Sequence, residues 1–196
     1  MASDLSPAEK SSAATAYLFW LLLALPAVYI VGTGLMSEGR PHYLRNTGLV
    51  SCWLLIVALA VTPLSMLFGA QPWIRWLRKV RRNIGVAAFG YACLHLVVFL
   101  KDTNVGALVR TFTRPEILTG WLGFAVMTAM AATSTESAVR RMGTGWKKLQ
   151  QLIYGGALLI LWHWAFSEKH YLEVAIYVAP LVLLTLWRLM RRRIGA

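Results

Sequence analysis

Long apolar runs without a single charge constrain this chain more than any other feature. The run IGVAAFGYACLHLVVFL covers residues 84–100, and similar runs lie on both sides of it. A helix needs about 20 apolar residues to cross the hydrocarbon core of a bilayer, and these runs approach that length. Because 58% of the residues are hydrophobic and only 14% are charged, the composition excludes an ordinary soluble domain. The sequence predicts an all-α, polytopic protein surrounded by the lipid bilayer.

Six such runs predict a six-helix transmembrane bundle. Pro26 and Pro63 fall inside two of the runs, where transmembrane helices tolerate proline. We expect a polar N-terminal tail at residues 1–15, one six-span domain at 16–190 and a basic tail at 191–196. The predicted spans cover residues 16–36, 47–68, 84–100, 117–134, 149–166 and 172–190.

The distribution of basic residues predicts how the bundle is oriented. With six spans, both termini and the second and fourth loops lie on the same side of the membrane. That side holds 14 of the 20 Lys and Arg residues, and positive charge marks the cytoplasmic side of membrane proteins. Both termini are therefore predicted to be cytoplasmic. The net charge of +12 is explained by membrane orientation, so we expect no binding of nucleic acid.

Two histidines lie inside predicted spans at similar depth. His95 ends a helical face of small residues, and His163 lies in the fifth span. Counted from the cytoplasmic ends of these two parallel spans, each lies roughly 18–21 Å along its helix. Two imidazoles at equal depth suit the axial positions of one heme iron. For each histidine alone, interfacial anchoring or a hydrogen bond to a neighbouring helix is the alternative interpretation.

Other residues extend this predicted heme site. Gly156 lies two turns before His163 and would make room for the porphyrin. Arg114, at the start of the fourth span, is a candidate partner for a heme propionate because Arg suits carboxylates. The alternative for Arg114 is a charge at a helix end whose side chain extends to the interface. His42 and His170 fall in predicted loops, where solvated or interfacial positions are expected.

The sequence also disfavours several other classes of function. No Asp or Glu lies in the middle of a predicted span, which disfavours proton-coupled transport. We find no glycine-rich nucleotide motif after a strand, no zinc-like Cys and His spacing, and no Ser, His and Asp arrangement. No flavin or nicotinamide domain is expected after the sixth span. A redox role would therefore need an electron donor from elsewhere.

Several motifs resemble the ferric-reductase-like transmembrane family. RRNIGVAAFGYACLH at residues 81–95 resembles the family's third span, and TRPEILTGWLGF at 113–124 resembles its fourth. WKKLQQLIY followed by WHW resembles the fifth span, while LRNTG and VTPL fit the second. Together these motifs cover roughly residues 44–166. Within the family, the chain is most similar to the heme-binding membrane subunits of periplasmic methionine sulfoxide reductase systems.

This resemblance implies a b-type heme protein of the bacterial inner membrane. Such a subunit takes electrons from quinol or from a cytoplasmic flavin reductase. It passes them to a periplasmic molybdopterin-containing subunit, which reduces oxidised methionine in proteins, so the substrate site would lie on the partner. FMN is a further cofactor associated with the family. By residue-by-residue correspondence, His95 and His163 fall on the family's heme ligands.

One position departs from the family pattern. Thirteen residues before His163, where the family has histidine, this chain has Gln150. Glutamine is a poor ligand for heme iron compared with imidazole, so one heme is expected and a second is in doubt. Arg81 and Gln150 are candidates for lining a flavin or quinone site on the cytoplasmic side. The alternative functions are a heme protein serving a metal or oxygen reductase, and a cofactor-free membrane scaffold.

Overall fold

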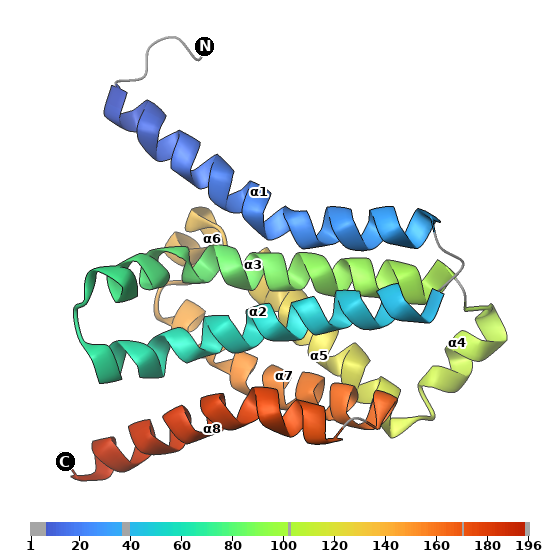
Figure 1. Cartoon of the computed structure of the whole chain (residues 1–196). Coiled ribbons are helices and arrows are strands. Elements are labelled where there is room, and N and C mark those ends of the chain that lie inside the picture. The colour runs from blue at the N-terminus through green and yellow to red at the C-terminus, as the bar shows by residue number, and fades with distance from the viewer. Residues whose placement is uncertain (1–6, 37–39, 102, 170, 195–196) are drawn as a thin grey trace.

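Helices make up nearly all of the computed structural model, which describes residues 7–36, 40–101, 103–169 and 171–194 (Figure 1). The long helices are α1 (Pro7–Met36), α2 (Arg40–Phe68), α3 (Pro72–Lys101), α5 (Pro115–Ala132), α7 (Thr144–Glu168) and α8 (Tyr171–Ile194). The short helices are α4 (Val105–Thr111) and α6 (Glu136–Met142). The predicted all-α class is confirmed.

Within the described ranges, 5 helices are long and apolar enough to cross a membrane, namely α1, α2, α3, α5 and α8. The helix α7 has 25 residues but is not among them. Its polar residues Gln150, Gln151 and His163 lower its hydropathy. A multi-pass membrane protein is therefore confirmed, whereas the count of six spans stays a prediction.

The helices extend beyond the predicted spans at several ends. The basic segment before residue 84 forms the first turns of α3, which begins at Pro72. The helix α1 begins at Pro7, inside the predicted polar tail, and α2 begins at Arg40, inside the predicted first loop. Hydropathy marks only the part of a helix that suits lipid, whereas polar turns at its ends form the same backbone hydrogen bonds. Residues 1–6, His170, residues 195–196 and the side chain of His42 lie outside what the structure describes.

Two predicted loops contain the short helices α4 and α6. Asn104 caps α4 by accepting a hydrogen bond from the backbone N–H of Ala107 at 2.8 Å. Thr135 caps α6 in the same way, with Ala138 as the donor at 3.2 Å. Such side-chain caps satisfy amides that have no partner within the helix. Loop segments of mixed polarity therefore form short helices of about two turns each.

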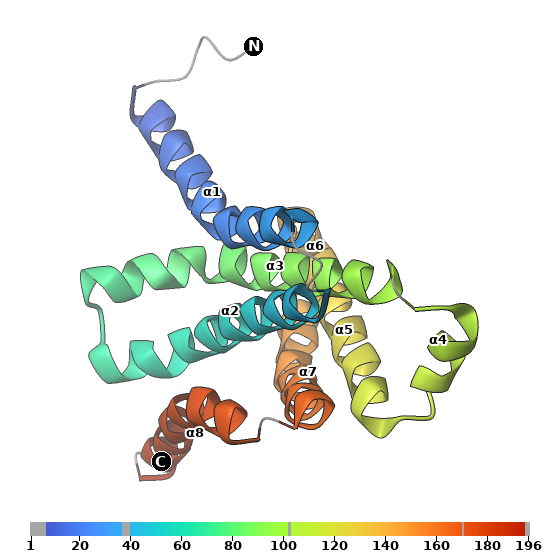
Figure 2. The same cartoon turned by 45° about the vertical axis from the view of Figure 1, so that its right-hand side comes forward.

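The helices α2, α3, α5 and α7 form the core of the protein. The helix α2 packs along α3, and α5 packs along α7 (Figures 1 and 2). Glycines bring α5 and α7 close together, since a Cβ at Gly123 would lie 2.6 Å from Ile160 Cγ1. Small residues are typical of such contacts between membrane helices. A buried apolar cluster joins the two helix pairs through Leu55, Leu59, Ala88, Met127 and Ala157.

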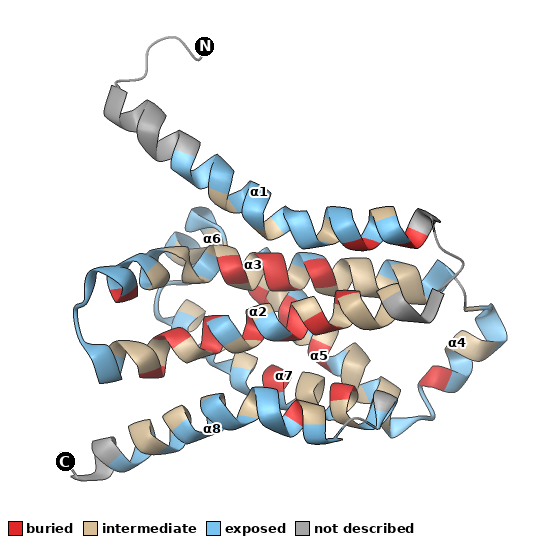
Figure 3. Ribbon diagram, viewed as in Figure 1, coloured by how far each residue is buried: buried red, intermediate tan, exposed pale blue. Residues whose placement is uncertain are grey.

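The helices α1 and α8 lie at the periphery, with most described side chains exposed (Figure 3). Many of the exposed side chains of both helices are large and apolar, as expected for faces that contact lipid. The helix α1 bends near Pro26 (Figure 1). There Tyr91 of α3 donates its hydroxyl hydrogen to Leu23 O at 2.7 Å and accepts from Ala27 N at 2.9 Å. In a regular helix the N–H of Ala27 would donate directly to the carbonyl oxygen of Leu23, and here the Tyr91 hydroxyl lies between them.

Candidate functional site

Two cavities lie toward opposite ends of the four core helices. The histidine cavity, of about 330 Å³, is lined by His95 and His163 together with residues of all four helices. The arginine cavity, of about 510 Å³, lies between the same helices and is lined by Arg78, Arg81 and Arg82. Arg82 and His95 are thirteen residues apart on α3, which corresponds to about 20 Å along a helix.

His95 is held by the backbone of α2. Its Nδ1–H donates to the carbonyl oxygen of Leu44 at 2.8 Å, and Thr47 Oγ1 lies 3.4 Å from the same nitrogen. A ring nitrogen that donates its hydrogen leaves the other nitrogen with a free lone pair. The Nε2 atom of His95 is therefore available as a ligand.

His163 is held by the equivalent interaction with α5. Its Nδ1–H donates to the carbonyl oxygen of Glu116 at 2.6 Å, and Ser167 Oγ lies 3.1 Å from the same nitrogen. Metal-binding histidines commonly have their other nitrogen oriented by a carbonyl or carboxylate in this manner. Both imidazoles of the cavity consequently have the tautomer that suits ligation through Nε2.

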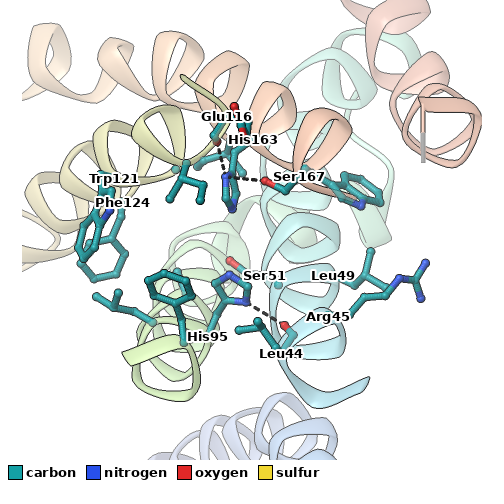
Figure 4. A pocket seen from close by; sticks show the side chains of 18 of the residues that line it. Leu44, Arg45, Leu49, Ser51, His95, Glu116, Trp121, Phe124, His163 and Ser167 are labelled. Atoms are coloured by element: carbon teal, nitrogen blue, oxygen red, sulfur yellow. Dashed lines mark hydrogen bonds between the residues drawn. The ribbon is translucent and has the colours of Figure 1, made fainter. Parts of the chain in front are cut away.

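The two imidazoles face each other across the histidine cavity (Figure 4). Their ring centroids are 6.3 Å apart and their planes are inclined at 79°. In Figure 4 the hydrogen-bonded nitrogens point away from the gap, toward Leu44 and Glu116. A metal ion bonded to two opposed imidazoles at ~2.0–2.1 Å, the bond length known for zinc, separates the ring centroids by roughly 6 Å. The spacing of His95 and His163 fits a shared metal centre.

A glycine lies against each imidazole. A Cβ on Gly48 would be 3.1 Å from His95 Nδ1, and a Cβ on Gly120 would be 2.8 Å from His163 Nδ1. In each case, the backbone carbonyl that accepts the hydrogen bond from the histidine belongs to the residue four positions before the glycine. In both helix pairs, α2–α3 and α5–α7, the histidine is thus held by the same arrangement of a backbone carbonyl and a closely packed glycine.

The rest of the histidine cavity is mostly apolar and aromatic, with a few polar groups. Aromatic side chains from three helices line it, namely Phe99, Trp121, Phe124 and Trp164. Arg114 also lines it and is exposed, and its guanidinium group has no hydrogen-bond or ion-pair partner among the described residues. Arg45 lines it as well and pairs with Glu173 of α8 at 2.6 Å. An apolar cavity with a few oriented polar groups is typical of a cofactor site.

The arginine cavity has a different chemistry. Besides its three arginines it is lined by Lys147, and no carboxylate or imidazole is among its lining residues. Arg81 Nε donates to the carbonyl oxygen of Ala58 at 2.9 Å, and Arg82 donates to the carbonyl oxygen of Ser134. The Nε2 atom of Gln150 is buried and has no acceptor in the described part of the chain. This cavity therefore offers several donors and positive charge to a ligand.

The structure separates the sequence-predicted residues into three places. His95, His163 and Arg114 meet in the histidine cavity. Arg81 and Gln150 meet in the arginine cavity. Gly156 is not among the residues that line either one.

Gly156 instead lies between two core helices. A Cβ there would be 2.6 Å from Val126 Cγ1 on α5. The observed role of Gly156 is thus close packing of α5 against α7. Room for a porphyrin beside this glycine stays a prediction.

Sequence reasoning missed several residues of the histidine cavity. The glycines Gly48 and Gly120 each follow a threonine in LRNTG and EILTG, and this repeated Thr-Gly pair was a usable signal. Ser167 lies four residues after His163, which places both on one helix face. The contact between Arg45 and Glu173 joins residues 128 positions apart, so no local pattern could reveal it.

The ligand set suits a heme better than a bare ion. Within the described residues there is no group of three or more His, Cys, Asp and Glu side chains that could hold a metal ion. Structural zinc sites use four protein ligands and catalytic sites use three. A porphyrin supplies the four equatorial nitrogens itself, so two imidazoles complete the coordination.

Comparison with known proteins identifies the family of the chain. The family model described as "Ferric reductase like transmembrane component" matches residues 47–161, which is more than half of the chain. The chain belongs to the ferric reductase-like transmembrane family. The range matched by this family contains His95 and both glycines of the histidine cavity, and it ends two residues before His163. No solved structure matches the chain.

Relatives within the family are named protein-methionine-sulfoxide reductase heme-binding subunit MsrQ. The protein from Ralstonia nicotianae is 34% identical over an alignment of 187 positions, which covers 89% of this chain and 84% of the relative. The protein from Azospira oryzae is 32% identical over an alignment of 198 positions, which covers 95% of this chain and 83% of the relative. The protein from Xanthomonas campestris pv. campestris is 36% identical over 153 residues, covering 76% and 68%.

Proposed function

We propose that this chain is the membrane electron-transfer subunit of a methionine sulfoxide reductase system, with one heme b between His95 and His163. The observation that carries the proposal is the opposed pair of imidazoles, 6.3 Å apart between centroids. Both rings are oriented by backbone carbonyls so that Nε2 is free. The names of the relatives, which are heme-binding subunits, support the same cofactor.

Different residues of the histidine cavity would ligate the heme iron, orient the ligands and bind the propionates. A heme b supplies a one-electron iron couple. His95 and His163 would ligate through Nε2 while Leu44 and Glu116 fix the ring orientations. Arg114, whose guanidinium group has no partner among the described residues, would bind a propionate carboxylate.

The chemistry of the arginine cavity favours one heme over two. A second b-type heme at this end of the core would need imidazole ligands, and none lines the cavity. Gln150 lines this cavity, at the position where the resemblance to the family leads us to expect a histidine. We therefore assign the arginine cavity to the electron donor, with Arg81 and Gln150 as hydrogen-bond donors to a quinol or flavin. FMN fits the positive charge of this cavity through its phosphate.

The same proposal fixes the orientation in the bacterial inner membrane. With α7 as the fifth of six spans and both termini cytoplasmic, the arginine cavity opens toward the cytoplasm and the histidine cavity toward the periplasm. Electrons would enter from quinol or a cytoplasmic flavin reductase and leave to a periplasmic molybdopterin-containing subunit. Reduction of oxidised methionine would occur on that partner.

The absorption spectrum of the purified protein tests the proposal. Protein expressed with ample heme is expected to show a Soret band that shifts on reduction, and a pyridine hemochrome assay should give one heme per chain. His95→Ala and His163→Ala should each abolish the low-spin spectrum, whereas His170→Ala serves as the control and should retain it. A colourless wild-type protein would refute the proposal.

A further inference from the structure

A single apolar layer separates the two cavities. Phe124 lines the histidine cavity, Phe89 lines the arginine cavity, and Met127 lines both. The rings of Phe89 and Phe124 are stacked, with centroids 5.6 Å apart and planes inclined at 29°. Met127 is buried, with 4% of its surface exposed. The two cavities are therefore next to each other at Met127 and at the stacked pair of Phe89 and Phe124.

The surrounding residues make this layer tightly packed. Met127 belongs to the buried cluster that joins the helix pairs, and Phe89 packs against that cluster. Ala88, the neighbour of Phe89, is completely buried, and its carbonyl oxygen accepts a hydrogen bond from Ser51 Oγ at 2.8 Å. Close-packed apolar side chains leave few voids large enough for water. Such a layer is unfavourable for an ion, whereas an electron can pass through it.

We propose that electrons pass from the arginine cavity to the histidine pair through the contact of Phe89 with Phe124, backed by Met127. This inference rests on the proposed function, since it needs a donor in one cavity and a heme in the other. Electron transfer through protein depends on continuous contact between packed atoms, and a void along the route weakens it. The two phenylalanines are positioning residues, because neither is oxidised nor reduced itself.

The redox step has a simple balance when the donor is menadiol, a soluble quinol. One menadiol is oxidised to menadione and releases two protons into the water of the arginine cavity. Its two electrons reduce two ferric centres to ferrous, one in each of two protein molecules. Only electrons cross the layer, so both protons remain on the donor side.

Rapid mixing of the heme-loaded full-length protein with menadiol tests the proposal. Phe124→Ala opens a void at the contact, and the limiting rate of heme reduction is expected to fall several-fold. Phe124→Leu refills most of the space and should largely restore the rate. The menadiol concentration that gives half of the limiting rate should not change, since Phe124 does not line the arginine cavity. Phe166→Ala is the matched control, because Phe166 stacks on Trp162 with both rings exposed and away from the layer.

Two further measurements distinguish the loss of an electron-transfer route from a structural change at the heme. The oxidised and reduced spectra of Phe124→Ala should keep the form that two imidazole ligands give, because Phe124 lines the histidine cavity without being a ligand. Its midpoint potential is measured as well, and a loss of rate that a shift in potential fully explains would overturn the route. Reduction by dithionite, which is expected to reach the heme without binding in the arginine cavity, should keep its rate. If Phe124→Ala loses the spectrum, Phe89→Ala takes its place, because Phe89 does not line the histidine cavity.

The outcomes distinguish this inference from the proposed function. Equal limiting rates in the wild type and in a spectrally intact alanine variant would overturn the route while leaving the heme assignment in place. Equal slowing with dithionite and menadiol would also overturn it, since the effect would then lie at the heme. Absence of the two-histidine spectrum in the wild type would refute the proposed function itself.

Discussion

Gly120 lies directly against the imidazole of His163, so that a Cβ at this glycine would be 2.8 Å from Nδ1 and 2.9 Å from Cε1. Side-chain atoms do not approach a ring this closely, so His163 could not keep its present position beside an alanine. The hydrogen bond from His163 to Glu116 would be lost with that position. His163 can therefore keep its orientation only because the residue facing it on α5 is a glycine.

The first prediction follows from this contact. Gly120→Ala should weaken or abolish heme binding, and Gly48→Ala should have a smaller effect, because its Cβ would be 3.1 Å from His95 Nδ1. Gly155→Ala is the control, since a Cβ there meets no atom within 4 Å. Heme content per chain, from the pyridine hemochrome, is the measurement. Normal heme content in Gly120→Ala would show that His163 does not need this position.

The second prediction concerns the hydroxyl of Ser167, which lies 3.1 Å from His163 Nδ1. Acceptors at Nδ1–H make the imidazole a stronger electron donor to a metal, which stabilises the oxidised iron. Ser167→Ala should therefore leave heme binding intact and raise the midpoint potential by some tens of millivolts. A redox titration followed at the Soret band measures the shift. A lower potential in the variant would contradict the predicted direction.

The third prediction concerns the hydroxyl of Tyr91, which bridges Leu23 O and Ala27 N in α1. Tyr91→Phe removes both hydrogen bonds, and leaving such groups unsatisfied costs about 1–3 kcal/mol. Thermal unfolding in detergent should show a lower midpoint for this variant. Tyr17→Phe is the control, because Tyr17 is 72% exposed, and its midpoint should not move.

The fourth prediction concerns the ion pair of Arg45 with Glu173, which ties α8 to the wall of the histidine cavity. Glu173→Gln removes one charge of a pair that is about one third exposed, so we expect a loss of up to about 1 kcal/mol in unfolding free energy. Glu136→Gln breaks the pair with Arg140, which is 3.6 Å long and highly exposed. That variant should leave stability unchanged. Equal effects of both substitutions would indicate that the position of the pair does not matter.

Local sequence patterns predicted most of the membrane architecture. Runs such as residues 84–100 lie inside helices of the structure, and Pro26 and Pro63 lie within α1 and α2. Hydropathy could not give the helix ends, because segments such as Pro72–Asn83 satisfy their backbone as a helix while carrying five basic residues. It also could not give α4, whose cap at Asn104 is a single side-chain hydrogen bond.

The sequence by itself determined that the chain crosses a membrane and that His95 and His163 lie at matching depth on two helices. Those properties depend on residues close together in the chain, since apolar runs and helical rise are local. Only the tertiary structure decided that the two imidazoles face each other and that Gly156 packs against α5. It also decided that Phe89 and Phe124 meet between two cavities. These contacts depend on how the helices α2, α3, α5 and α7 pack, and such packing is set by residues far apart in sequence.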